Sequence, residues 1–179
     1  MSMGEDSEES MFKTSGLMGY LVKRLNEERP DTQVGKTIIQ KMMYLLSRNG
    51  IIDFDFSMYH YGPYSSEVAG ELNFAERNGI VEISWEDDKG YFIKPTNKIE
   101  KFSYLLDDDE KRAVDELIER FGGFKAIDLS LIATALYLKD NFGVGDDRLV
   151  DAVHNAKNKY SLVYIEGVLK AGGIISAVP

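Results

Sequence analysis

The sequence lacks cysteine among its 179 residues, which excludes disulfide bonds, thiolate metal ligands and a cysteine nucleophile. This absence fits a reducing compartment, and we expect a cytoplasmic protein. The sequence also lacks any run of about 18 apolar residues, so we expect no membrane-spanning helix. Residues 1–10 are acidic, whereas a secretory signal is basic and then apolar. We therefore expect these ten residues to form a disordered acidic leader.

Basic residues are few relative to acidic ones. The 21 lysines and arginines against 30 aspartates and glutamates give a formal net charge of −9. A charge of this size keeps a protein soluble and repels phosphate backbones and anionic membranes at long range. The apolar fraction of 44% is ordinary for a globular protein, and the length suits one domain or a small domain with an extension.

Residues that usually carry catalysis or bind metals are scarce. The two histidines, His60 and His154, lie far apart, and no zinc-protease, nucleophile-elbow or P-loop motif is present. The acidic run Asp107–Glu110 lacks the spacing and the glycine of a calcium loop, and negative charge at a helix start explains it. Gly143 and Gly145 lack the third glycine of a dinucleotide-binding loop. We therefore expect no enzyme, no cofactor and no metal site.

Apolar periodicity and turn residues predict three helices, an aromatic strand and a β-hairpin in the first part of the chain. The helices are expected at 11–28, 35–49 and about 66–78, the aromatic strand at 54–61 before a Gly62-Pro63 turn, and the hairpin strands at 80–85 and 91–94. This is the element order of a winged helix, a helix-turn-helix followed by a β-hairpin wing.

The expected fold is therefore α+β and mostly helical, with a winged-helix-like module at 11–96 and a small β-hairpin wing. Residues 97–106 form a connector, and 107–179 form a C-terminal helical bundle on which the module packs. Arg77–Val81 and Ala171–Ile175 share a helix end, a glycine and β-branched residues. The C-terminal region is either a second, wingless helix-turn-helix-like unit, or the two segments are ordinary helix ends.

Two segments carry a resemblance to a known family. Gln40–Leu46 reads Q-K-M-M-Y-L-L, and Tyr59–Glu67 reads Y-H-Y-G-P-Y-S-S-E. This pattern resembles the Panacea domain of SocA-like antitoxins and "phage-associated" proteins, and it is closer still to an uncharacterised bacterial and archaeal group of YwgA-like proteins. The resemblance covers about residues 11–94. It implies an antitoxin or adaptor module that neutralises or presents partner proteins, with a structural role for the Y-G-P motif and no catalytic residue.

The third helix and the wing are the places where a winged helix usually meets DNA. The residues expected to be exposed there are mostly acidic: Glu67, Glu71, Glu76 and Arg77 on the helix, and Asp87 and Asp88 at the wing tip. Because phosphate contacts supply much of the affinity for DNA, these carboxylates weigh against DNA binding. They suit a basic protein partner, such as a nucleic-acid-binding toxin.

The aromatic segment is the other candidate for partner contact. It contains Phe54, Phe56, Tyr59, Tyr61 and Tyr64. Tyrosine is enriched at protein interfaces, which makes the three tyrosines candidate partner-binding residues. Side chains alternate along a strand, however, and the favoured interpretation is that these aromatics mainly line the core.

The prediction is a non-catalytic protein-interaction module, antitoxin-like or an adaptor, with a regulatory role. One alternative is a dimeric winged-helix transcriptional regulator that binds DNA through Lys36, Lys41 and Arg48 of the second helix. A second alternative is an enzyme whose site has no recognisable motif. The oligomeric state is open, and a homodimer is compatible with the sequence.

Overall fold

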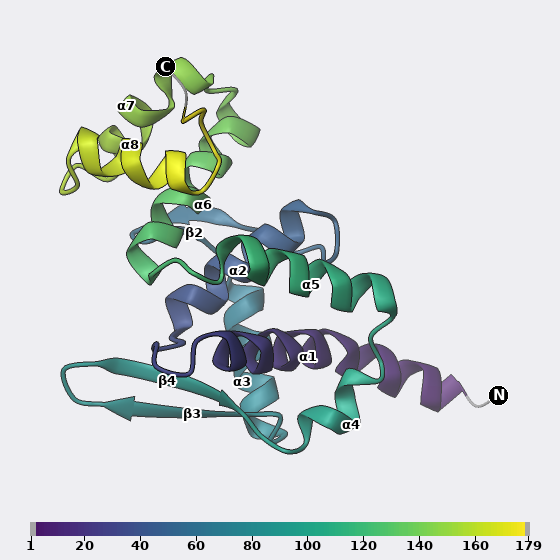
Figure 1. Ribbon diagram of the computed structural model, residues 1–179. Helices are drawn as coiled ribbons and strands as arrows, with labels where there is room; N and C mark the ends of the chain where they lie inside the picture. The colour runs from purple at the N-terminus through teal and green to yellow at the C-terminus, as the bar shows by residue number, and fades with distance from the viewer. Residues whose placement is uncertain (1–2, 178–179) are drawn as a thin grey trace.

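The computed structural model describes residues 3–177 and shows a mostly helical α+β protein with two small antiparallel hairpins (Figure 1). The first part of the chain contains α1 Met3–Glu28, α2 Lys36–Arg48, β1 Ser57–Tyr59, β2 Gly62–Tyr64, α3 Ser66–Arg77, β3 Val81–Glu86 and β4 Gly90–Pro95. The second part contains α4 Ile99–Ser103, α5 Asp108–Phe121, α6 Ala126–Phe142, α7 Asp146–Ala156 and α8 Leu162–Ala171. The expected order of three helices and a wing is therefore observed.

The first helix is longer than the periodicity predicted. It begins at Met3, so the residues up to Ser10 that were expected to be a disordered leader are helical, while Met1 and Ser2 lie outside the described residues. Glutamate is a good helix former, and acidic residues near a helix N-terminus are favourable. The buried part of α1 begins at Ser15, and the N-terminal turns extend past α4 (Figure 1).

The second helix lies at the centre of the molecule, and its residues from Ile38 to Leu46 are all buried. It ends in a glycine cap, in which Gly50 adopts a φ of +79° and Ile51 N–H donates to Leu46 O at 3.1 Å. The same cap ends α3 at Gly79 and α8 at Gly173, both with a φ of +69°. The echo between residues 77–81 and 171–175 is therefore a helix C-cap motif that also occurs at α2.

The aromatic segment folds differently from the expected single strand. β1 and β2 form a two-stranded antiparallel hairpin, with Ser57 opposite Tyr64 and Tyr59 opposite Gly62. The turn is at residues 60–61, and Gly62–Pro63, expected as the turn, begins β2. Proline is tolerated in β2 because a strand of a two-stranded sheet has an unpaired edge.

The wing matches its prediction closely. β3 pairs antiparallel with β4 from Val81 opposite Pro95 to Glu86 opposite Gly90. Asp88 with a φ of +66° and Gly90 with a φ of +93° provide the left-handed residues of the turn. The hairpin extends to one side of α1 and α3, at the opposite end of the molecule from α7 and α8 (Figure 1).

Side-chain caps begin two of the C-terminal helices, α5 and α8. Asp107 accepts a hydrogen bond from Glu110 N–H at 2.8 Å and caps α5, and Ser161 caps α8. Asp128 is of a residue type that often caps helices, but α6 begins two residues earlier, at Ala126. The Asp128 carboxylate instead accepts a hydrogen bond from the hydroxyl of Tyr164, so it ties α6 to α8.

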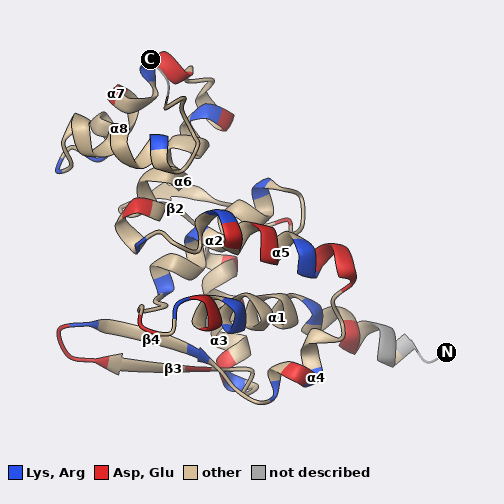
Figure 2. Ribbon diagram, in the orientation of Figure 1, with Lys and Arg blue, Asp and Glu red and all other residues tan. Residues whose placement is uncertain are grey.

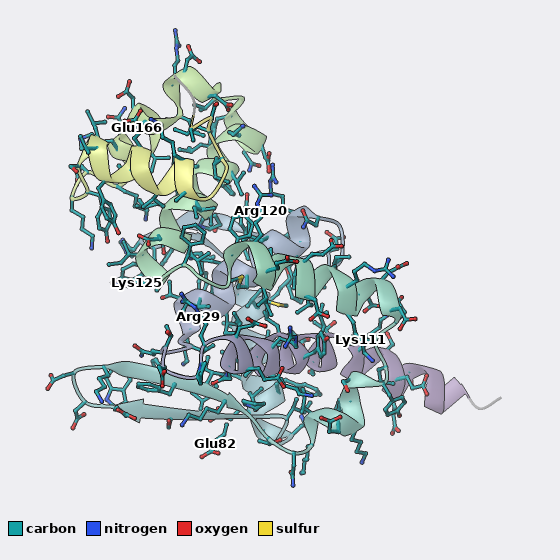
Figure 3. The ribbon with its side chains drawn as sticks, in the orientation of Figure 1. Arg29, Glu82, Lys111, Arg120, Lys125 and Glu166 are labelled. Atoms are coloured by element: carbon teal, nitrogen blue, oxygen red, sulfur yellow. The ribbon has the colours of Figure 1, made fainter. Side chains whose placement is uncertain are left out.

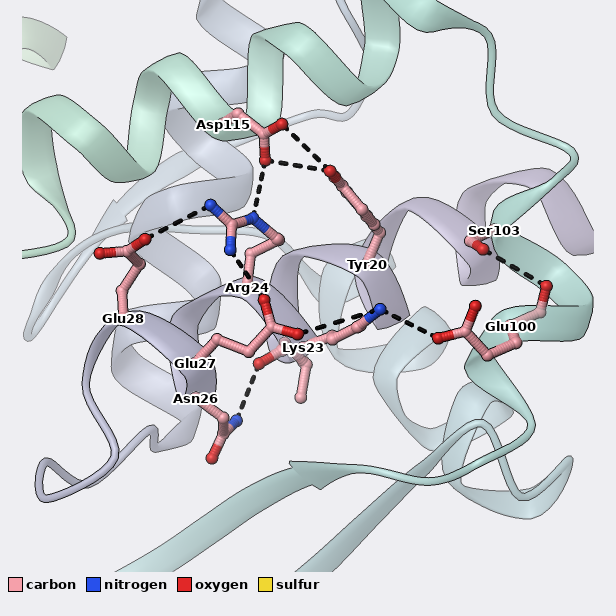
Figure 4. Close-up of polar contacts among 10 residues, drawn as sticks. Tyr20, Lys23, Arg24, Asn26, Glu27, Glu28, Glu100, Ser103 and Asp115 are labelled. Atoms are coloured by element: carbon pink, nitrogen blue, oxygen red, sulfur yellow. Dashed lines mark hydrogen bonds and ion pairs between the residues drawn. The ribbon is translucent and has the colours of Figure 1, made fainter.

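A polar cluster joins the N-terminal module to the C-terminal helices (Figure 4). Arg24 of α1 donates to Asp115 of α5 at 2.9 Å, and Tyr20 donates to the same carboxylate at 3.0 Å. At the end of α1, Arg29 donates to the carbonyl oxygens of Gly123 and Phe124, close to the start of α6 (Figure 3). The two parts are therefore held together by specific polar contacts as well as by a shared apolar core.

No single helix within residues 3–177 is long and apolar enough to cross a membrane. Helices α5 and α6 are long and apolar enough for a membrane span only when they are taken together. The angle between the two helices is 111°.

Candidate partner-binding groove

The two segments that carry the family resemblance lie against each other. Gln40 of α2 donates from Nε2 to Ser65 O at 2.9 Å and accepts at Oε1 from Ser65 N–H at 3.0 Å. The next residue, Lys41, donates from Nζ to Pro63 O at 2.9 Å. The Q-K pair therefore binds the backbone of the Y-G-P-Y-S segment, which gives both motifs a structural role.

A second lysine also holds the backbone of the hairpin. Lys157, which follows α7, donates from Nζ to Tyr59 O at 3.3 Å and also to His60 O. Burial, together with the charge of Lys159, lowers the pKa of Lys157. Burial and the charge of Lys157 lower the pKa of Lys41 to about 8. The two ammonium groups thus fix the hairpin between α2 and the C-terminal helices.

This anchoring leaves the hairpin tyrosines on the surface. Tyr59 is 61% exposed, Tyr61 63% and Tyr64 37%. The expectation that the aromatic segment mainly lines the core is correct for Phe54 and Phe56, which are half-buried against it, and wrong for the tyrosines. A two-stranded hairpin has one face on the protein and the other in solvent, so half of its side chains have no core to enter.

Three hollows meet at Tyr61 and at Thr37 in the first turn of α2. One of about 290 Å³ lies between α2, the β1–β2 hairpin and α3. One of about 250 Å³ lies between the hairpin turn, the start of α6 and the segment after α7. One of about 440 Å³ lies between the start of α2 and the wing. Both residues line all three, and we call this continuous surface the tyrosine groove.

The groove has the opposite charge to the protein as a whole. Its lining contains no aspartate or glutamate among the described residues and includes five lysines: Lys36, Lys41, Lys89, Lys157 and Lys159. Lys89 forms an ion pair with Glu86 at 3.1 Å, and Lys36 lies 3.8 Å from the centre of the Tyr91 ring. Figure 2 shows acidic residues at the wing tip, next to Lys89, and along α5. A basic, aromatic concavity therefore lies in an acidic protein.

The acidic residues predicted to bind a partner do not line the groove. Glu71 accepts a hydrogen bond from Ser15 at 3.1 Å, and Glu67 accepts from Asp55 N–H at 3.0 Å, so both have structural roles. The carboxylate of Asp87 accepts from Trp85 at 3.3 Å. The others, Glu76, Arg77 and Asp88, are exposed. The structure thus brings the three predicted tyrosines together and leaves the predicted charged residues on separate surfaces.

The sequence analysis missed Lys157 and Lys159, which belong to no recognisable motif and lie far from α2 in the chain. Lys41 belongs to the Q-K pattern, and Lys36 was named only as a DNA contact of the alternative regulator. Among residues 3–177, no three histidine, aspartate or glutamate side chains are grouped as a metal site would require.

The fold and the groove define an acidic, mostly helical α+β protein with a basic, tyrosine-lined concave surface. In sequence, the chain is similar to the uncharacterised protein YwgA of Bacillus subtilis (strain 168). The two are 26% identical over 133 residues, which cover 70% of this chain and 76% of YwgA. No family model matches the sequence.

Proposed function

We propose that this protein is a non-catalytic protein-recognition module, antitoxin-like or an adaptor, that binds its partner at the tyrosine groove. The observation that carries the proposal is the position of Tyr59, Tyr61 and Tyr64, which are exposed around a hollow of about 290 Å³. Tyrosine is enriched among the residues that dominate binding energy at protein interfaces. The resemblance to the Panacea domain supports the same class of function.

The anchoring of the hairpin supports a binding role. Gln40, Lys41 and Lys157 fix its backbone before any partner arrives. A surface that is already ordered loses less conformational entropy on binding than a flexible one. The exposed tyrosines can therefore contribute most of their contact energy to affinity.

The alternative of a DNA-binding dimer has less support. Two of the three cations it would use are engaged, because Lys41 is buried and Arg48 forms an ion pair with Asp140 at 2.6 Å. The groove also lacks the paired acid and base of a hydrolytic site among the described residues, which favours recognition over catalysis. The predicted basic partner would meet Glu76 and Asp88 outside the groove.

A photo-crosslinking experiment tests the proposal. A photoreactive amino acid replaces Tyr61 in one full-length variant and Tyr104 in another, because Tyr104 is similarly exposed at 67% and belongs to the segment after α4. We expect a protein to be crosslinked from position 61 and not from position 104. That protein, once purified, should bind the wild type about tenfold more tightly than Tyr61→Ala, with no change for Tyr104→Ala.

The proposal fails if both positions crosslink the same proteins, or if Tyr61→Ala and Tyr104→Ala bind the purified partner equally well. Circular dichroism of each variant checks that the fold is retained. Because both tyrosines are exposed, neither substitution should affect the core.

A further inference from the structure

We propose that the tyrosine groove binds a short, extended, acidic segment of a partner protein. Carboxylates of the segment would pair with Lys36, Lys157 and Lys159, and an apolar side chain would enter the hollow between α2 and α3. This inference rests on the proposed function and specifies the chemistry of the partner.

The first support is that three of the five groove lysines have no carboxylate partner. Within residues 3–177, no ion pair involves Lys36, Lys157 or Lys159, whereas Lys89 at the edge of the groove pairs with Glu86. In a chain with 30 acidic residues, three neighbouring lysines without such a pair form a local positive region. The first turn of α2 adds to it, since this turn contains no acidic residue and its dipole is positive at that end.

The second support comes from the tyrosine hydroxyl groups. Tyr20 and Tyr164 each donate a hydrogen bond to an aspartate within the protein. The hydroxyls of Tyr59, Tyr61 and Tyr64 have no hydrogen-bond partner in the part of the chain that the structure describes. Carboxylates of a bound segment would give these three hydroxyls the kind of acceptor that Tyr20 and Tyr164 have.

The shape of the groove favours an extended occupant with one apolar anchor. The hollow between α2 and α3 is lined by Ile39, Val68 and Leu72 below the tyrosines. It continues past Tyr61 into the hollow beside Lys157 and Lys159. An extended chain alternates its side chains, so one residue can point into the apolar hollow while its neighbours reach the lysines.

The surroundings favour a peptide over a nucleic acid, although lysines and exposed aromatics also occur in single-strand-binding grooves. The hollow beside the wing ends at Lys89 and Gly90, directly next to the acidic Glu86, Asp87 and Asp88 (Figure 2). A polyanion that continues beyond the groove would meet these carboxylates and the net charge of −9. In a short acidic segment, all of the negative charges would lie near the groove lysines and away from the wing-tip carboxylates.

Fluorescence anisotropy with synthetic ligands tests the inference on the full-length protein. The ligands are a labelled octapeptide of glutamates around one phenylalanine, the same peptide with glutamine or with lysine in place of glutamate, and an oligothymidylate. We expect the glutamate peptide to bind most tightly, at least about tenfold better than the lysine peptide at about 0.15 M salt, and more weakly at higher salt.

Substitutions in the groove should reduce this binding in a defined way. Lys36→Gln and Lys159→Gln should each weaken it about threefold and together about tenfold, which is the range for exposed ion pairs. The control is Lys111→Gln on α5, a half-buried lysine like Lys36 but distant from the groove (Figure 3), which should leave binding unchanged. Circular dichroism confirms the fold of each variant.

The inference is overturned if the glutamate and lysine peptides bind equally, if the oligothymidylate binds more tightly than either, or if Lys111→Gln weakens binding as much as Lys36→Gln. Its failure can be separated from that of the proposed function. A partner that crosslinks at position 61 but is not displaced by the glutamate peptide leaves the recognition role intact and refutes only the acidic segment.

Discussion

Lys41 donates a hydrogen bond from Nζ to the carbonyl oxygen of Pro63 at 2.9 Å, although its side chain is only 2% exposed. A buried ammonium group is costly unless it is well paired, and here its partner is a neutral carbonyl. The contact joins α2 to β2, directly behind the exposed tyrosines. The groove is therefore supported by an interaction whose strength depends on pH.

Burial is the main cause that lowers the pKa of Lys41 to about 8, with Lys157 contributing. The unfolded chain keeps this proton up to the usual lysine value, so folding releases a proton between these two pKa values and stability rises with pH there. We expect the free energy of unfolding of the wild type, relative to Lys41→Met, to increase by about 2 kcal/mol between about pH 7 and about pH 9.5. Urea denaturation at both pH values measures this difference in the free energy of unfolding. Equal changes with pH in the wild type and in Lys41→Met would contradict the prediction.

Gln40→Leu should destabilise the protein by about 1–3 kcal/mol, because it leaves the buried N–H group of Ser65 without a partner. It also removes one of the two hydrogen bonds that Ser65 O accepts, the other coming from Ala69 N–H. Gln33→Leu is a matched control. Gln33 also makes two hydrogen bonds to backbone, to Lys89 O and Tyr91 O, but in an exposed position where water can replace it. We expect a loss below about 1 kcal/mol for the control in thermal and urea denaturation. Equal losses of stability in the two variants would contradict the burial of Ser65 as the cause of the destabilisation.

Local chemistry explains which parts of the fold could be predicted from sequence. Ser65, Asp107 and Ser161 are residue types that favour helix caps, and each caps its helix, since a cap depends on residues within one turn. Asp128 has the right type for a cap, but it bonds to Tyr164, which is distant in the chain. No local pattern can indicate that competition.

The residues of the groove could likewise be predicted only where a local sequence pattern indicates them. The tyrosines were recognised as candidates because they cluster in sequence, and the Q-K pair because it belongs to a motif. Lys157 reaches the hairpin only because α6 and α7 bring it back to the carbonyl of His60. The positive charge of the groove is thus a property of tertiary structure, and the overall acidity of the chain pointed to a partner of the other sign.

Gly62→Ala should destabilise the protein by about 2–4 kcal/mol. Gly62 has a φ of +94°, and an added Cβ would lie 2.8 Å from Thr134 Oγ1 and 3.1 Å from Ser130 O. Gly70→Ala is the control, because Gly70 lies within α3 with open space around its Cβ position. It should stabilise the protein by about 0.5–1 kcal/mol through helix propensity. Opposite shifts in melting temperature are the expected result, and a neutral Gly62→Ala would contradict the close packing of β2 on α6.

Thr134 of α6 is fully buried, and its Oγ1 has no hydrogen-bond partner within the described residues. A buried hydroxyl without a partner loses its hydration and gains nothing in return, whereas a methyl group of similar size would not. We therefore expect Thr134→Val to raise the free energy of unfolding by up to about 1 kcal/mol, measured by urea denaturation.

Thr134→Ser is the control for this effect, because it keeps the hydroxyl and removes the methyl group. It should destabilise by about 1 kcal/mol through the lost packing. If Thr134→Val is instead the destabilised variant, the hydroxyl must have an acceptor in solution. Ser130 O is one candidate, since it and Thr134 Oγ1 both lie beside Gly62 at the contact between α6 and β2. Loss of that bond would then weaken the support of the hairpin, and binding at the groove would fall together with stability.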